Sequence, residues 1–175
     1  MFAVCFIQPL CYADEVSSDI IQLHDSWNTE YKEYVFEKSL SNGIDPYVVF
    51  GIIYNESRYQ EDVTNLNTNG TTDYGLMQIN EVNFDYLHNT IGIESMNDLL
   101  DPYKNIECGI ELLRYHTDLA NDTKLGLIGY QSGAGTMARL IQKGIYETEV
   151  QQQVLDYAEV YRKEYIETND NICPC

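Results

Sequence analysis

Residues 45–80 read DPYVVFGIIYNESRYQEDVTNLNTNGTTDYGLMQIN, and this stretch indicates the fold of the chain more strongly than any other. Its first half is apolar and helix-forming, whereas its second half is polar and rich in turn residues. Each half carries one acidic residue of interest, Glu56 in the first and Asp73 in the second. Contrasting surroundings of this kind move the pKa values of two carboxyl groups apart.

The first half predicts a buried helix that begins at Pro46. Asp45 is suited to cap its amino end, and a proline costs nothing at the first helical position. The following residues are apolar nearly all round, which is typical of a central helix: Val48, Val49, Phe50, Ile52, Ile53 and Tyr54. Glu56 falls at the carboxyl end, where apolar neighbours and the helix dipole both raise its pKa. This is the environment of a general acid.

The second half predicts a short β-hairpin, or ribbon, over residues 65–80. Asn69-Gly70 is a strong tight-turn signal, and Asp73 follows it in the polar stretch. We expect three amide side chains to hydrogen-bond Asp73 and to keep it ionised, namely those of Asn65, Asn67 and Asn80.

Helices are predicted elsewhere by capping signals and by apolar residues that recur every three or four positions. They are expected near residues 25–41, 81–90, 102–120, 122–131, 136–143 and 146–167. The last of these carries a stripe of valine and tyrosine that is most simply core packing. The sequence therefore predicts a mainly α (α+β) domain with a buried central helix and a small β-hairpin that carries the second carboxylate.

Length and charge restrict the classes of function. A chain of 175 residues suffices for one domain with a real hydrophobic core. The formal net charge of −18 would repel nucleic acid and anionic membrane surfaces. We therefore expect no nucleic-acid partner. We also expect no stable membrane insertion, because the first thirteen residues are too short to span a bilayer and no later segment is a candidate.

The first thirteen residues carry no charge and end in Cys11-Tyr12-Ala13, just before Asp14. This pattern is typical of an export signal with its cleavage site, although the basic n-region is missing. The alternative is an N-terminal strand or buried segment. The first interpretation divides the chain into a truncated signal peptide (1–13), a helical extension (14–40), a main domain (41–167) and a tail (168–175).

Cysteines and histidines give little guidance about function. Cleavage after Ala13 would leave Cys108, Cys173 and Cys175, and an odd number of cysteines cannot all pair within the chain. The sequence does not choose among the pairings. The three histidines lie singly, without the spacing of metal ligands: His24, His88 and His116. We expect neither a metal nor another cofactor.

Cleavage of a glycosidic bond requires an acid that protonates the leaving oxygen and a group that stabilises the cationic sugar. Glu56 suits the first role and Asp73 the second. The spacing alone is weak evidence, because most such pairs are surface charges. The residues around the two acids make the hypothesis more specific.

Three ordered motifs resemble those of the soluble lytic transglycosylase (SLT) domain in the lysozyme-like superfamily. They are Glu56-Ser57, Gly75-Leu76-Met77-Gln78-Ile79-Asn80 and Gly129-Tyr130-Gln131-Ser132-Gly133. Residues 105–109 also resemble the helix before the third motif, and the ribbon 67–75 is similar to the catalytic ribbon of chicken-type lysozymes and of small SLT proteins of secretion systems. The resemblance spans about residues 40–165 and implies a lysozyme-like helical fold. The cysteine framework of animal lysozymes is absent, which favours the bacterial branch.

By position, the resemblance implies Glu56 as the catalytic acid/base and Asp73 as the second catalytic carboxylate. Tyr130 is expected to hydrogen-bond near Glu56, and the backbone around Met77 to line the sugar groove. Gln131 stands where the third motif usually has Asn, and its extra methylene moves the amide. The implied substrate-binding residues are Ser57, Met77, Gln78, Asn80, Tyr130 and Gln131.

The resemblance implies an exported enzyme that acts on peptidoglycan in the cell envelope or outside the cell. A lytic transglycosylase cleaves the β-1,4 bond between N-acetylmuramic acid and N-acetylglucosamine and leaves a 1,6-anhydro sugar. The alternatives are a muramidase that hydrolyses the same bond with Glu56 and Asp73, and a non-catalytic glycan-binding or assembly module. A secretion, conjugation or phage-tail apparatus is a candidate partner.

Overall fold

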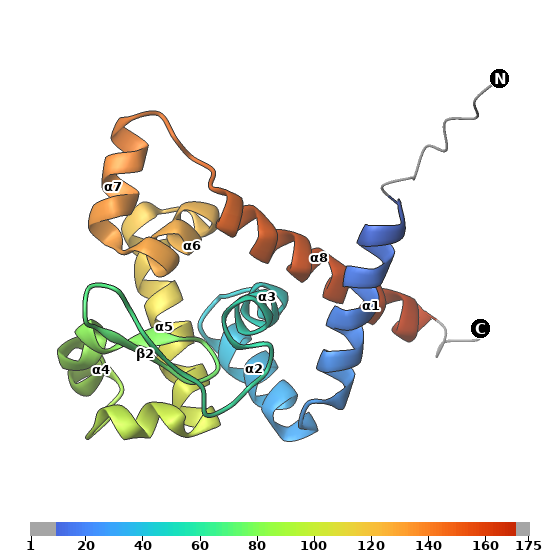
Figure 1. Ribbon diagram of the computed structural model, residues 1–175, viewed down its shortest axis with the longest axis horizontal. Coiled ribbons are helices and arrows are strands. Elements are labelled where there is room, and N and C mark those ends of the chain that lie inside the picture. Colours follow the sequence, from blue (N-terminus) through green and yellow to red (C-terminus); the bar gives the residue numbers. More distant parts are fainter. Residues whose placement is uncertain (1–9, 171–175) are drawn as a thin grey trace.

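The computed structural model describes residues 10–170, with side chains for residues 17–165. Within this range the chain is mainly helical and holds one small antiparallel sheet (Figure 1). The predicted fold class is confirmed. The α-helices are α1 (Leu10–Ser26), α2 (Thr29–Ser41), α3 (Pro46–Ser57), α4 (Phe84–Thr90), α5 (Pro102–Ala120), α6 (Thr123–Ser132), α7 (Ala134–Gln142) and α8 (Glu149–Asp170). The strands are β1 (Thr64–Leu66), β2 (Thr72–Tyr74) and β3 (Ile79–Asn80), followed by the 3-10 helices η1 (Glu81–Asn83) and η2 (Met96–Leu100).

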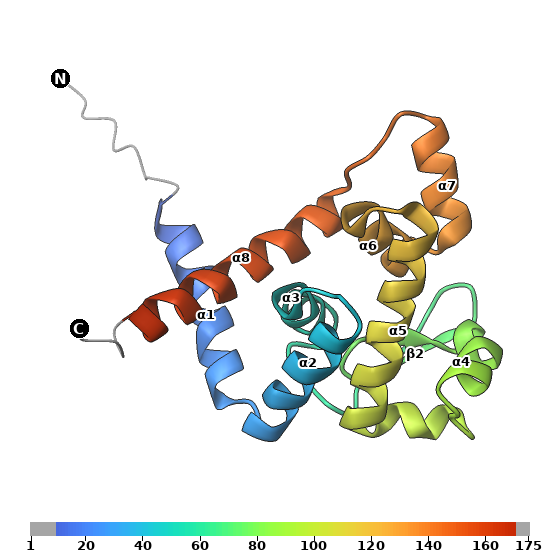
Figure 2. The same cartoon turned by 180° about the vertical axis from the view of Figure 1, so that it is seen from behind.

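Helix α3 is the buried centre of the fold, as the sequence predicts. The Asp45 side chain accepts a hydrogen bond from the Tyr47 backbone N–H (2.9 Å), and Pro46 occupies the first turn. Nine of the twelve residues of α3 are buried. Figures 1 and 2 show α3 end-on near the middle of the molecule, with α8 on one side and α2 on the other. Its carboxyl end, and Glu56 with it, is thereby held by packing from several elements.

The ribbon is a three-stranded sheet with the order β1-β2-β3. Asp73 lies on the central strand, where its register partners are Asn65 on β1 and Asn80 on β3. The sheet has one strand more than the predicted hairpin. Asp73 therefore has a neighbouring strand on both sides.

A buried asparagine on α5 attaches the ribbon to the helices. Asn105 Oδ1 accepts from the Met77 backbone N–H (2.8 Å), while its Nδ2 donates to the carbonyl oxygens of Tyr74 (2.8 Å) and Leu99 (2.7 Å). One side chain thus satisfies three backbone groups, two of them in buried hydrogen bonds and one in a partly buried one.

The helix expected over residues 25–41 is two helices, so its predicted start was wrong. Helix α1 ends at Ser26, and α2 begins at Thr29. The Asn28 side chain accepts from the Glu30 backbone N–H (2.9 Å) and caps α2, while Trp27 is buried in the core. Because Trp27 packs into the core and Asn28 caps the next helix, the chain changes direction between α1 and α2.

The N-terminal segment lies only partly within the described residues. Residues 10–13 belong to α1, whereas residues 1–9 are outside the described range, as are Cys173 and Cys175. Cys108 is a buried free thiol in α5. Among the helices described, none is both long and apolar enough to cross a membrane.

Candidate active site

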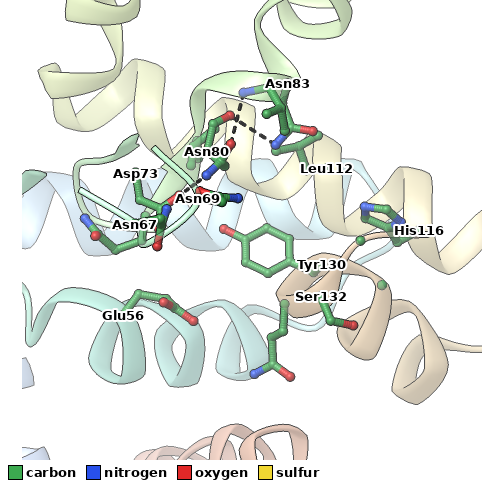
Figure 3. Close-up of a pocket in the computed structure, with 16 residues that line it drawn as sticks. Glu56, Asn67, Asn69, Asp73, Asn80, Asn83, Leu112, His116, Tyr130 and Ser132 are labelled. Atoms are coloured by element: carbon green, nitrogen blue, oxygen red, sulfur yellow. Dashed lines mark hydrogen bonds between the residues drawn. The ribbon is translucent and has the colours of Figure 1, made fainter. Parts of the chain in front are cut away.

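A cavity of about 420 Å³ opens between the end of α3, the ribbon, α5 and α6 (Figure 3). Its walls are mostly polar, with a few apolar side chains. The lining residues are Glu56, Asn67, Asn69, Asp73, Gln78, Ile79, Asn80, Val82, Asn83, Leu112, His116, Gly129, Tyr130, Gln131, Ser132 and Gly133. All three sequence motifs contribute to this one space.

Glu56 projects into the cavity from the last turn of α3 and is partly buried. Burial raises the pKa of its carboxyl group, and the negative charge of Asp73 raises it further. A hydrogen bond from Asn55 Nδ2 to Glu56 Oε1 (3.2 Å) acts in the opposite direction and lowers the pKa. The net effect is the expected one. It favours the protonated form, which a general acid requires.

Asp73 faces the cavity from β2, with an amide donor on each carboxylate oxygen. Asn67 Nδ2 donates to Oδ2 (2.9 Å) and Asn80 Nδ2 donates to Oδ1 (2.7 Å). Both contacts agree with the expectation from sequence. Two hydrogen bonds of this kind fix the orientation of the Asp73 carboxylate.

The expected contact between Asn65 and Asp73 was wrong. Asn65 Nδ2 donates instead to Gln78 Oε1 (2.6 Å). Each carboxylate oxygen of Asp73 already accepts from another amide, and the Asn65 donor is taken by Gln78, whose backbone is left-handed (φ 46°). Gln78 Nε2 then donates to the carbonyl oxygens of Gly75 (2.7 Å) and Val63 (3.2 Å). The Gln78 amide therefore holds the ribbon together while Gln78 lines the cavity.

Tyr130 crosses the cavity from α6, and its ring lies to one side of the two acids (Figure 3). Its hydroxyl donates to the Met77 carbonyl oxygen (2.6 Å). Burial raises the pKa of this phenol well above its usual range, so the hydroxyl remains a donor. The contact joins the third motif to the second.

The other predicted site residues divide into two groups. Asn80 and Gln131 line the cavity, and both amide atoms of Gln131 are buried without a partner among the described residues. Ser57 and Met77 do not line it. The Ser57 hydroxyl donates to the Ile53 carbonyl oxygen (3.1 Å) within α3, and the Met77 side chain is fully buried.

Several residues that line the cavity are not among those that the sequence predicts for the site: Asn69, Val82, Asn83, Leu112, His116 and Ser132. Ser132 lies in the third motif, and Asn69 in the quoted turn. Leu112 and His116 are four apart on α5, and this spacing places them on the same helical face. Nothing in the sequence relates that face to the ribbon.

This arrangement suits acid-assisted cleavage of a bond between sugars. A partly buried acid with a raised pKa faces a carboxylate that is held by two amides, across a space that is lined with hydrogen-bonding groups. One carboxyl group can give a proton to a leaving oxygen, while the other stabilises positive charge on the sugar. Among the residues described, no group of three or more His, Cys, Asp or Glu side chains could hold a metal ion.

Comparison with known proteins agrees with the motifs. Residues 33–149 match the family described as the transglycosylase SLT domain. The fold is similar to that of an inactive mutant of the lytic transglycosylase Slt from Pseudomonas aeruginosa (TM-score 0.64, 21% identity, 76% of this chain and 24% of that chain). It is also similar to the 70-kDa soluble lytic transglycosylase in its complex with bulgecin A (TM-score 0.67, 20% identity, 82% of this chain and 26% of that chain). The similar region is thus about a quarter of those proteins, and none of the curated proteins matches.

Proposed function

This chain belongs to the transglycosylase SLT family, and on that basis we propose that it is a lytic transglycosylase that cleaves peptidoglycan. The bond is the β-1,4 linkage between N-acetylmuramic acid and N-acetylglucosamine. The observation that carries the proposal is the geometry of Glu56. It is partly buried, its pKa is raised, and it faces Asp73 in a cavity that the three family motifs line.

In the proposed mechanism Glu56 acts twice. Its proton passes to the glycosidic oxygen as the bond from that oxygen to the anomeric carbon breaks. The resulting carboxylate accepts the proton of the muramic 6-hydroxyl, whose oxygen forms a new bond to the anomeric carbon. The products are a 1,6-anhydro end and a free hydroxyl on the leaving sugar, and Glu56 is protonated again. No water is consumed.

Asp73 is proposed to stabilise the cationic sugar between these two steps. Each of its oxygens already accepts an amide hydrogen bond, so its position does not depend on the substrate. A charge that is fixed in advance stabilises a transition state without the cost of reorganising it.

The same pair of acids also supports a second candidate, a muramidase. Asp73 faces Glu56 closely enough for its charge to act on the Glu56 pKa, and two carboxyl groups are what hydrolysis of a glycoside commonly uses. In that reaction water replaces the 6-hydroxyl, and the product has a reducing end. Either activity would place the protein in the cell envelope or outside the cell. Its proposed partner is a secretion, conjugation or phage-tail apparatus, for which the protein would open the wall locally.

The products of digestion distinguish the candidates. Purified peptidoglycan is treated with the protein, and the released muropeptides are analysed by mass spectrometry. We expect 1,6-anhydro ends. Reducing ends would identify a muramidase, and intact wall would identify a binding or assembly module.

Glu56→Gln is the matching variant for this digestion. We expect it to lose nearly all cleavage and to unfold at no lower temperature than the wild type, because the amide keeps the shape and cannot donate the proton. Glu94→Gln is the control, since Glu94 is exposed and outside the cavity. Glu56 is not the acid if its variant keeps more than a few per cent of the wild-type turnover.

A further inference from the structure

The chain leaves α3 through a strained joint that follows Glu56 almost directly. Arg58 and Tyr59 both have left-handed backbones, with φ of 53° and 62°, although neither is glycine. This conformation costs free energy for a residue with a side chain, so two in succession need contacts that hold them. The joint lies between α3 and β1. It therefore connects the helix that carries Glu56 to the ribbon that carries Asp73.

Tyr59 is held by aromatic side chains from other elements. It is only 7% exposed. Its ring packs against Trp27, which lies between α1 and α2, and against His24 on α1, with ring centroids 4.9 Å and 6.0 Å away. Its hydroxyl donates to the Tyr161 hydroxyl on α8 (2.8 Å). We call these three partners of Tyr59 the aromatic clamp.

Arg58 is held as well, through a second tyrosine. Its guanidinium carbon lies 3.8 Å from the centroid of the Tyr54 ring, which is close enough for a cation–π contact. The Tyr54 hydroxyl in turn donates to Asp19 Oδ2 on α1 (2.9 Å). Both left-handed residues are thus tied to α1, and Tyr59 is tied to α8 in addition.

The side chains that hold the joint come largely from outside the residues that match the family model. That match covers residues 33–149, whereas Asp19, His24 and Trp27 precede it and Tyr161 follows it. None of these four residues lines the cavity. Figure 1 shows α1 on the side of α3 away from the ribbon. These residues can nevertheless affect the site through the joint that they hold.

We propose that Tyr59 is a positioning residue for Glu56. The aromatic clamp holds Tyr59, and with it the left-handed joint, and this fixes where the Glu56 carboxyl group stands relative to Asp73. The segments on either side of the family match are therefore part of the working site. The consequence for cleavage rests on the proposed function, whereas the position of Glu56 can be measured without it.

The test is the pKa of the Glu56 carboxyl group, measured by NMR titration of that group. The groups that act on it are Asn55 beside it on α3, Asp73 on the ribbon and Tyr130 on α6. Burial and the charge of Asp73 raise the Glu56 pKa, and both depend on where Glu56 stands. A loosened joint should therefore lower this pKa toward that of an exposed glutamate.

Trp27→Leu removes an aromatic ring from the clamp and leaves position 59 unchanged. We expect the Glu56 pKa to fall and kcat to decrease about tenfold to a hundredfold, as it does when catalytic groups are displaced by a small distance. Tyr59→Phe loses only the hydrogen bond to Tyr161, so both quantities should change in the same direction by less. Trp27→Phe keeps a ring and should remain close to the wild type.

Arg58→Gly tests the joint itself. Glycine adopts a left-handed backbone without steric cost, so the joint then needs less support from the clamp. Added to Trp27→Leu, this change should restore part of the Glu56 pKa and part of kcat. If the clamp contributed only to the stability of the core, the Glu56 pKa of the folded protein would change in none of these variants.

Two variants on α4 are the matched controls, since no residue of α4 lines the cavity. Tyr86→Phe removes a hydroxyl that donates to a carboxylate on α5 (2.6 Å), which is the same chemical change as Tyr59→Phe. Leu87→Ala removes part of a fully buried side chain, as Trp27→Leu removes part of a largely buried one. Both should leave the Glu56 pKa unchanged. All measurements are made well below the thermal midpoint of each variant.

The outcomes separate this inference from the proposed function. An unchanged Glu56 pKa in Trp27→Leu and Tyr59→Phe overturns the positioning role and leaves the proposed reaction intact. An equal fall in the α4 controls overturns it too, because the effect is then one of general stability. If Trp27→Leu does not fold, the smaller change in Tyr59→Phe decides. If the wild type leaves peptidoglycan intact, the proposed function fails, while the titration still decides whether the clamp fixes Glu56.

Discussion

At the scale of single residues, the chemistry of Glu56 depends on what surrounds it. Burial has the largest effect on its pKa, and the charge of Asp73 adds to that effect. The neutral form of a raised-pKa carboxyl group is dominant below the shifted pKa and is lost above it. The acid is therefore available at a higher pH than an exposed glutamate would allow.

The first prediction concerns the pH dependence of cleavage. Activity should fall as the pH rises through the raised pKa of Glu56, because only the protonated form donates a proton. The measurement is kcat/KM against pH, which reports the pKa in the free enzyme. A rate that rises over the same interval would exclude Glu56 as the acid.

The second prediction is that Asp73→Asn changes both the rate and the pH profile. Loss of a fixed charge near the cationic sugar should lower kcat about a hundredfold or more. The charge of Asp73 also raises the Glu56 pKa, so its removal should move the falling limb of the profile to lower pH. Asp62→Asn, on an exposed residue, should do neither. A near-normal rate would leave Asp73 a structural role in the ribbon only.

The site contacts that the sequence predicts correctly are those between residues that lie close together in the chain. Asn67 and Asn80 flank Asp73 closely in the chain, and both donate to it as expected. The left-handed backbone of Gln78 could not be foreseen, because glutamine rarely adopts it and tertiary hydrogen bonds hold it there. The Asn65 amide bonds the side chain of this same Gln78 and not Asp73.

At the scale of elements, the ribbon depends on α5 for its position. Asn105 bonds three backbone groups, two of them at the ribbon and one at the end of η2. Motif resemblance draws attention to residues 105–109, but only the structure shows that this side chain connects the second motif to the helix. The break between α1 and α2 was missed for a similar reason. The Asn28 cap of α2 follows Trp27, and the burial of Trp27 depends on tertiary packing that local sequence does not predict.

The third prediction is that Asn105→Ala loosens the ribbon. Three backbone groups lose their partner, and each one that is buried costs about 1–3 kcal/mol. Because relaxation and water recover part of this, we expect a loss of about 2–4 kcal/mol in the free energy of unfolding in urea. Cleavage should fall as well, since Asp73 moves with the ribbon. Asn89→Ala on the exposed face of α4 is the control and should change stability little.

At the scale of the whole molecule, α8 returns from far along the chain to cover α3. The two helices approach closely at Gly51, where an added Cβ atom would lie 2.5 Å from the Val154 carbonyl oxygen. A second contact lies just beyond α3, where the Tyr59 hydroxyl donates to the Tyr161 hydroxyl (2.8 Å). Periodicity predicts both helices, but not which of their faces meet.

The fourth prediction tests the close contact between α3 and α8 at Gly51. Gly51→Ala should destabilise the protein by about 1–3 kcal/mol, because the new methyl group meets backbone that cannot move aside. Gly135→Ala on α7 is the matched control. Its Cβ atom meets nothing within 4 Å, and alanine favours a helix, so stability should rise by up to about 1 kcal/mol. Equal effects of the two changes on the thermal midpoint would contradict the close approach.

The packing of α8 on α3 also affects when the fold is completed during synthesis of the chain. About ninety residues separate the end of α3 from the start of α8. Ribosomes add roughly 5–20 residues per second, so α3 is synthesised several seconds before its cover exists. Over that interval α3 has its contacts with α2 but lacks those with α8, so its packing is incomplete. The packing that fixes Glu56 is therefore complete only after α8 has been made.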